Sequence, residues 1–398
     1  MIDLPVSEFD FSPMHRRMQR YVDQGTLPGL STLTLRGQQI VDLRCYGSMD
    51  LESGKPLAPD TLFRLHSNSK LITSVAAMIL CEEGKLRLDA PLAEHIPKFA
   101  DVSVFKPDAQ GPNDLEPLRV PITLRHLLTH TSGLSYGFLD SDHVVDRTYA
   151  AAGVFQSVFL RKGTLESLVH SLCRMPLAFQ PGTAWRYSLA TDVISRVIEL
   201  VSGEPFDQFL ERRIFQPLGM HDTGFWVPED KRERLATLYT KQQDQHVSIS
   251  GPNGSLYFDP GALKSGGGGL ISTITDYARL VCMLSAGGTW NGVRLLQPRT
   301  IELMRSPQIA AHLTIGSHQW HMPNTTYGLG VAVKLRPSDG EPPSAVGEFH
   351  WGGMAGTHWW ISPHADLSGL VMAQVLESFW RPFSHEFKRM AYEIAGAR

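Results

Sequence analysis

The chain has 398 residues, of which 42% are hydrophobic, and its formal net charge is −3 at pH 7. This length and apolar content predict a globular protein with two packed lobes. The small charge and the lack of long basic runs argue against a nucleic-acid partner and favour a small neutral substrate.

The cysteines, the histidines and the N-terminal residues give no indication of an oxidising compartment, of a metal or cofactor, or of a membrane partner. The four cysteines include no Cys-x-x-Cys pair, so nothing in them demands an oxidising compartment. The 16 histidines show no His-Glu-x-x-His spacing, and we expect neither a metal nor a cofactor. Because the N-terminus lacks a signal pattern and no segment is long enough to cross a bilayer, we predict a cytoplasmic, soluble protein without a membrane partner. The oligomeric state is not indicated.

The first predicted elements are a helix and a hairpin. Residues 14–24 are rich in Arg, Met and Gln and stop before Gly25, which predicts an amphipathic surface helix. Residues 30–35 and 40–47 are rich in β-forming side chains and are separated by a short polar link. They predict a hairpin that begins an antiparallel sheet.

A buried helix is predicted over residues 67–83, which contain neither proline nor glycine and stop before Gly84. On its first turn Ser67 and Lys70 are three residues apart, so their Cβ atoms lie roughly 5–6 Å apart on one face. The helix dipole and burial both disfavour a charged lysine, so a neutral Lys70 would take the proton of Ser67. The alternative is an N-cap serine followed by a solvated lysine.

The same Ser-x-x-Lys spacing recurs at Ser103 and Lys106. There Pro107 follows, which disfavours a helix, and the next residues are typical of a loop. Because no helical turn would stack this second pair, the pattern favours Ser67 as a nucleophile of the Ser-x-x-Lys type.

Residues 86–254 are dominated by helical patterns and by loops rich in proline and glycine. Within them, residues 123–133 predict a short helix with Thr123 as its N-cap and Gly133 at its end. Residues 133–137 satisfy Gly-x-Ser-x-Gly, which would mark Ser135 as the nucleophile of an α/β-hydrolase. That motif needs a preceding strand and a following helix. Neither is predicted, so we do not expect Ser135 to be catalytic.

Two further segments precede the C-terminal strands. Tyr187 lies between a Pro-Gly turn and a helix predicted over residues 191–202, and the residues alone favour an ordinary half-buried tyrosine there. Residues 261–269 are rich in glycine but lack the strand-loop-helix register of a phosphate site. They predict a close backbone crossing before a helix over residues 275–286.

The C-terminal section predicts a final helix over residues 383–395 and strands over residues 328–334, 348–351, 358–362 and 367–375. Together with the N-terminal hairpin they predict an α/β fold, of the α+β type, with a central antiparallel sheet. We predict one discontinuous domain of residues 1–85 and 255–398 and a mainly helical domain of residues 86–254. The active site is expected between them.

Four motifs occur in a characteristic order: residues 63–84, residues 128–134, Pro181-Gly182 leading to Tyr187, and Trp351-Gly352-Gly353. With them the chain resembles the serine β-lactamase superfamily. It is most similar to the family VIII carboxylesterases, which are related to class C β-lactamases. The resemblance runs from about Leu27 to Glu377 and implies a β-lactamase/transpeptidase-like fold.

The resemblance also implies a role for each matching residue. Ser67 would be the acylated nucleophile, Lys70 the base that activates it, and Tyr187 the residue that relays protons. The backbone N–H groups of Ser67 and Met354 would form the oxyanion hole. The substrate would be bound by Tyr136 in the acyl or alcohol pocket and by the strand residues Trp351, Gly352 and Gly353.

Two departures from the β-lactamase pattern bear on the substrate. Leu189 stands where penicillin-recognising enzymes carry the Asn of Tyr-x-Asn, and Trp351 stands where they carry the Lys of Lys-Thr-Gly. Losing a cation that pairs with a substrate carboxylate removes a charge-assisted hydrogen bond of about 1.5–3 kcal/mol. We therefore predict a preference for uncharged esters.

The leading hypothesis is a serine carboxylesterase that hydrolyses neutral, short-to-medium acyl esters through an acyl-Ser67 intermediate. Acyl transfer to an alcohol and weak hydrolysis of β-lactams are the expected side activities. The alternatives are a β-lactamase or D-alanyl-D-alanine peptidase, a non-catalytic binding protein on the same fold, and an α/β-hydrolase that uses Ser135.

Overall fold

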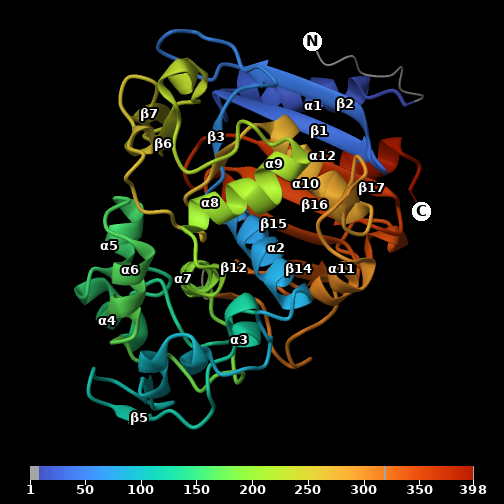
Figure 1. Ribbon diagram of the computed structural model, residues 1–398. Helices are drawn as coiled ribbons and strands as arrows, with labels where there is room; N and C mark the ends of the chain where they lie inside the picture. Colours follow the sequence, from blue (N-terminus) through green and yellow to red (C-terminus); the bar gives the residue numbers. More distant parts are fainter. Residues whose placement is uncertain (1–8, 318–319, 398) are drawn as a thin grey trace.

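A seven-stranded antiparallel sheet forms the centre of the protein (Figure 1). The structure is a computed structural model and describes residues 9–317 and 320–397. The strand order is β13-β14-β15-β16-β17-β1-β2. The strands are β1 (Gly29–Arg36), β2 (Gln39–Gly47), β13 (Thr325–Tyr327), β14 (Ala332–Lys334), β15 (Phe349–Gly353), β16 (Thr357–Ser362) and β17 (Leu367–Met372).

The N-terminal hairpin and the C-terminal strands share this sheet because β1 pairs with both β2 and β17. The predicted antiparallel sheet, completed by the C-terminal section, is therefore confirmed. The strand predicted over residues 328–334 is shorter, since it begins at Ala332. Before it, Gly330 has a positive φ, and a Cβ there would lie 2.0 Å from the Ser74 Oγ. The short strand β13 was not predicted.

Helices cover both faces of the sheet. Side chains of β1 alternate between two cores: Leu30 packs with α1 (Ser12–Asp23) and α12 (Phe383–Ile394), whereas Leu33 packs in the core that contains α2 (Ser69–Glu82). Both terminal helices begin and end within two residues of their predicted limits. The helix α10 (Ile274–Ser285) packs against β1, β16 and β17.

The section between the hairpin and α10 is mainly helical (Figure 1). The predicted N-cap Thr123 is confirmed by a capping box, but the helix ends at Leu128 and not near Gly133. The predicted end at Gly203 is also confirmed. The helices are α3 (Leu124–Leu128), α4 (Val144–Ala151), α5 (Val154–Phe159), α6 (Leu165–Leu172), α7 (Ala190–Ser202), α8 (Phe206–Leu210) and α9 (Gln216–Leu218), with a π-helical turn at Glu211–Phe215 before α9. The domain limits at residues 85 and 255 stay a prediction.

Smaller elements complete the chain. They are β3 (Phe63–Arg64) paired with β8 (Ile271–Ser272), β4 (Ser103–Phe105) with β5 (Leu115–Pro117), β6 (Leu238–Gln242) with β7 (Gln245–Ser250), β9 (Thr289–Trp290) with β10 (Val293–Arg294), β11 (Gly316–Ser317) with β12 (Trp320–His321), and α11 (Pro298–Met304). Within residues 9–317 and 320–397, no helix is long and apolar enough to cross a membrane.

A buried cluster of charges ties α12 to the sheet. Lys388 of α12 lies 2.8 Å from a carboxylate oxygen of Glu348 and 2.7 Å from one of Glu341. Lys334 forms a second ion pair with Glu341, and the Tyr392 hydroxyl donates to Glu348 at 2.8 Å. Glu348 directly precedes β15 and is fully buried, so this cluster holds the start of β15 against the C-terminal helix.

This cluster predicts loss of stability in acid. Burial alone would raise the pKa of Glu341, but Lys388 and Lys334 outweigh it and lower the pKa to about 2. The pKa of Glu348 is likewise well below its usual range, because Lys388 and His350 outweigh burial. A carboxyl whose folded-state pKa is depressed stabilises the fold above its unfolded pKa of about 4.3 and loses that contribution as pH falls toward the folded value.

We therefore expect the free energy of unfolding, measured in urea, to decrease between about pH 4.5 and pH 2. The variant Glu341→Gln should show a shallower slope over this range, because it has one such carboxyl fewer. Equal unfolding free energies at pH 6 and pH 3 would contradict this expectation.

Candidate active site

Ser67 lies in a 3-10 turn, His66–Asn68, that leads from β3 into α2. The predicted helix is confirmed, but its α-helical part begins at Ser69, two residues later than expected. Neither the 3-10 turn nor α2 is capped by a side chain, so the N-cap interpretation of Ser67 is wrong. His66 has φ +48°, a left-handed conformation that non-glycine residues rarely adopt and that is common at functional sites. Burial lowers the pKa of His66 to about 3, so its imidazole is neutral beside Ser67.

Lys70 is buried and faces Ser67. Its Nζ lies 3.3 Å from the Ser67 Oγ and donates to the Gly267 carbonyl oxygen at 2.6 Å. Only 1% of the residue is exposed, so the alternative of a solvated lysine is wrong. The Lys70 Nζ thus lies beside the hydroxyl whose proton it would accept.

The glycine-rich segment provides this carbonyl because it packs closely against neighbouring helices. A Cβ at Gly266 would lie 2.0 Å from the Ser195 Oγ on α7, and a Cβ at Gly267 would lie 2.6 Å from the Asp192 Oδ2. The predicted close crossing is therefore confirmed. Its contact with Lys70 was not predicted, since nothing in the local pattern indicates which chain segment the glycines approach.

Tyr187 lies directly beside Lys70. The Lys70 Nζ is 4.6 Å from the centroid of the Tyr187 ring and 5.5 Å from that of Tyr136, in cation–π geometry. The Trp351 Nε1 donates to the Tyr187 hydroxyl at 3.2 Å. Trp351 was predicted to bind the substrate in the place of a lysine, and the structure adds this hydrogen bond, which the sequence did not indicate.

Other aromatic rings surround Tyr187. The rings with centroids within 6.4 Å of its ring belong to His130, Tyr136, Trp185, Trp320 and Trp351. Burial lowers the pKa of His130 well below its usual value, so this imidazole carries no charge at neutral pH. The surroundings of Tyr187 are therefore apolar apart from Lys70 and a few hydrogen-bonding groups.

The end of β15 approaches the segment that enters the 3-10 turn. A Cβ at Gly353 would lie 2.4 Å from the Leu65 carbonyl oxygen, and the Thr357 hydroxyl donates to the same oxygen at 3.0 Å. Only glycine fits at position 353 without displacing backbone. Met354 follows and is 40% exposed. An oxyanion hole made by the N–H groups of Ser67 and Met354 stays a prediction.

The competing serine motifs do not form a catalytic arrangement. Ser135 is fully buried, donates to Asp146 through its Oγ and accepts from the Arg186 Nε at 2.9 Å. It belongs to a buried ion-pair cluster, because Arg186 also pairs with Asp146 at 2.7 Å. The α/β-hydrolase interpretation is therefore wrong. Ser103 lies on the strand β4, which cannot place it on one helical face with Lys106.

Asp192 is a further residue near Lys70 that sequence reasoning missed. It is fully buried on the first turn of α7, and its Oδ1 accepts from the Ser265 Oγ at 2.6 Å and from the Gly267 N–H at 3.3 Å. Its Oδ2 has no hydrogen-bond partner among the residues that the structure describes. Burial raises the pKa of Asp192, and Ser265 and Lys70 oppose this rise. The sequence did not indicate that Asp192 lies near Lys70, because acidic residues are common on the first turn of any helix.

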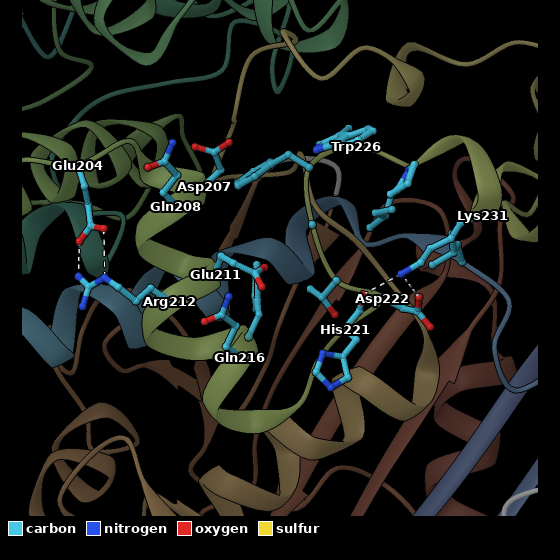
Figure 2. A pocket seen from close by; sticks show the side chains of 17 residues that line it. Glu204, Asp207, Gln208, Glu211, Arg212, Gln216, His221, Asp222, Trp226 and Lys231 are labelled. Atoms are coloured by element: carbon cyan, nitrogen blue, oxygen red, sulfur yellow. Dashed lines mark hydrogen bonds and ion pairs between the residues drawn. The ribbon is translucent and has the colours of Figure 1, made fainter.

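A separate cavity of about 530 Å³ lies between α8, the π-helical turn and the loop that carries His221 and Trp226 (Figure 2). It contains none of Ser67, Lys70 or Tyr187. Figure 2 shows that two of its acidic side chains already have ion-pair partners: Glu204 pairs with Arg212, and Asp222 with Lys231. The serine-lysine-tyrosine cluster, and not this cavity, therefore has the arrangement of a nucleophilic site.

Comparison with known proteins places the chain in a family. Residues 14–386 match the Beta-lactamase family. The chain belongs to the beta-lactamase family. The predicted superfamily and its mixed fold with an antiparallel sheet are thereby confirmed.

Several known proteins are similar to the chain over most of its length. Esterase EstB of Burkholderia gladioli is 31% identical, with 93% of each chain covered. Lovastatin esterase of Penicillium rubens is 31% identical over 91% of this chain and 92% of its own. The solved structure of EstCE1, "a hydrolase with promiscuous acyltransferase activity", has a TM-score of 0.80 and 29% identity, and covers 95% of this chain and 96% of its own. The prediction of a carboxylic ester hydrolase agrees with these names.

Proposed function

We propose that the protein is a serine carboxylesterase that hydrolyses neutral esters through an acyl-Ser67 intermediate. The observation that carries the proposal is the buried Lys70 Nζ, 3.3 Å from the Ser67 Oγ and facing the Tyr187 ring. A hydroxyl within reach of a buried amine is the arrangement that nucleophilic catalysis needs. The similarity to EstB and lovastatin esterase supports the same chemistry.

In the first half-reaction, neutral Lys70 accepts the Ser67 proton as the Oγ bonds to the ester carbonyl carbon. The carbonyl oxygen becomes an oxyanion, which the N–H groups of Ser67 and Met354 stabilise. The carbon–oxygen bond to the alcohol then breaks, and the alcohol leaves with a proton delivered through Tyr187. In the second half-reaction, water attacks the acyl-Ser67 carbonyl and gives up a proton to Lys70. The bond between the acyl carbon and the Ser67 Oγ then breaks, the carboxylic acid leaves, and Ser67 takes up the proton that came from the water.

Trp351 favours an ester over a β-lactam as the substrate. Its indole N–H donates to the Tyr187 hydroxyl at 3.2 Å, so it orients that hydroxyl without supplying a charge. A substrate carboxylate therefore gains no ion pair at this position. Transfer of the acyl group to an alcohol shares the same first half-reaction, and Monacolin J acid methylbutanoyltransferase of Aspergillus terreus, 30% identical over 87% of this chain, supports it as a side activity.

The test of the proposed function is the intact mass of the protein after incubation with a fluorophosphonate. We expect one adduct, mapped to the peptide that contains Ser67, and none in Ser67→Ala. The matched control Ser103→Ala, which removes the other serine of Ser-x-x-Lys spacing, should be labelled like the wild type. Labelling of Ser67→Ala at another serine, or no labelling of the wild type, would overturn the proposal. Faster turnover of nitrocefin than of p-nitrophenyl butyrate would favour a β-lactamase.

Asp192→Asn is expected to lower the acylation rate by roughly tenfold and to leave the thermal unfolding midpoint unchanged or higher. Asp192 accepts from the Gly267 N–H and Lys70 donates to the Gly267 carbonyl, and the Asp192 carboxylate stabilises the ammonium that forms when Lys70 accepts a proton. Asparagine keeps the shape and removes a buried charge that lacks a full set of partners, which often stabilises a protein. Pre-steady-state burst kinetics and a melting curve measure the two effects. A fall in both together would indicate a purely structural role.

A further inference from the structure

A row of aromatic rings begins beside Tyr187. We call Tyr136, Phe138, Phe155 and Phe159 the aromatic row. The Tyr136 centroid lies 5.2 Å from that of Tyr187, and the next contacts are 5.2 Å to Phe138 and 5.6 Å to Phe155. Phe138 and Phe155 lie 4.5 Å apart, and Phe159 is 6.4 Å beyond Phe155. The contacts are continuous from the proposed catalytic tyrosine to the last ring.

Two rings of the aromatic row are exposed, Phe155 is half-buried and Tyr136 is buried. Tyr136 is 5% exposed, whereas Phe138 is 48% and Phe159 is 57% exposed. Single exposed apolar side chains are ordinary, but a contiguous exposed patch marks a binding surface, because leaving it in water forgoes the free energy of burial. Here the exposed rings are continuous with buried ones beside Lys70. This continuity distinguishes them from the scattered exposed residues Leu51 and Leu256.

The backbone presents these rings together. Phe155 and Phe159 are four residues apart on α5, so they share one helix face. Gly153, with φ +64°, precedes this helix and allows the chain to turn from α4 into α5. Phe138 follows Gly137, whose φ is +92° and where a Cβ would lie 2.8 Å from the Tyr149 Cβ. Two separate segments of chain are thus shaped to form one aromatic surface.

We propose that the aromatic row binds the apolar, aryl-bearing part of the ester substrate, an inference that rests on the proposed esterase function. The four side chains of the row carry no charge, and Lys70 faces the ring of Tyr136 at its inner end. Aromatic rings prefer offset or edge-to-face contact with other rings, as they make with one another here. An aryl group that extends from the ester carbonyl continues this arrangement, whereas a carboxylate finds no positively charged partner in the row.

The inference is tested with Phe138→Ala and Phe159→Ala, at two exposed positions where truncation leaves no internal cavity. The substrates are 2-phenylethyl acetate, with the aryl group on the alcohol, ethyl 3-phenylpropanoate, with it on the acyl group, and ethyl acetate, which has none. We expect kcat/KM for one aryl ester to fall by about tenfold in Phe138→Ala, mostly through KM, and that for ethyl acetate to stay within about twofold. The control is Leu51→Ala, which removes a similarly exposed apolar side chain that is not part of the row.

The possible outcomes separate this inference from the proposed function. Equal losses for all three esters, or no loss for either aryl ester, would overturn the aromatic row as a substrate site. If Ser67 is still labelled and ethyl acetate is still hydrolysed in that case, the esterase proposal stands. If the wild type hydrolyses none of the three esters and resists labelling, both proposals fail.

Discussion

Replacing Lys70 with arginine is expected to lower kcat/KM for an ester by roughly 10²–10⁴-fold, the usual contribution of a positioned acid–base group. Arginine supplies a positive charge and has N–H donors for the Gly267 carbonyl, but its guanidinium cannot lose a proton in a protein and so cannot act as a base. The variant therefore separates two roles of Lys70. If Lys70 acts as the base for Ser67, arginine fails as badly as methionine. If Lys70 supplies only charge, arginine retains most of the activity.

The measurement compares wild type, Lys70→Arg and Lys70→Met by the rate of acylation with p-nitrophenyl butyrate, and each variant's fold is checked by circular dichroism. Lys264→Met is the matched control, because it also removes a lysine, and Lys264-Ser265-Gly266 has a residue pattern similar to the Lys-Thr-Gly motif. The Lys264 Nζ donates to the Pro260 carbonyl and, among the residues that the structure describes, has no hydrogen bond to Ser67, Lys70 or Tyr187, so its loss should leave the acylation rate unchanged. An active Lys70→Met variant would contradict the assignment of Lys70 as the base.

Lys388→Met is expected to lower the free energy of unfolding by roughly 3–5 kcal/mol, the usual cost of removing one partner from a buried ion pair. Lys388 lies within 2.8 Å of carboxylate oxygens of both Glu341 and Glu348. Without it, Glu348 keeps its hydrogen bond from Tyr392 and its neighbour His350 but remains a fully buried carboxylate without a lysine partner. A charge left in the interior is costly, so the carboxyl either takes up a proton or the C-terminal helix loosens.

Urea unfolding of wild type and variants measures this effect. The neighbouring Arg389→Met removes an exposed ion pair with Glu393 and should cost at most about 1 kcal/mol. The double variant Lys388→Met with Glu348→Gln should recover part of the loss, because it also removes the unpaired charge. A loss below about 1 kcal/mol in Lys388→Met would mean that the cluster contributes nothing to stability.

The sequence by itself determined the elements whose signals are local. The hairpin of β1 and β2, the helix α2, the end of α7 at Gly203 and the helix α12 all follow from periodicity and from glycine at their ends. The local pattern also distinguished Ser67 from Ser103 and Ser135. A helix follows Ser67, whereas Ser103 lacks the helical turn, and Ser135 the strand and helix, that their motifs require. The ordered motifs indicated Tyr187 and Trp351. In the structure Tyr187 lies beside Lys70, and Trp351 lies beside Tyr187.

Only the tertiary structure decided what these groups contact. The Gly267 carbonyl that binds Lys70 is 197 residues away in the chain, and Trp351 is 164 residues from Tyr187. Asp192, the ion pairs around Ser135 and the aromatic row arise in the same way, from segments that are separate in sequence. Periodicity indicates which face of an element is buried, but it does not indicate which other segment covers that face. The partners of a buried polar group are set by packing, and so were visible only once the chain was folded.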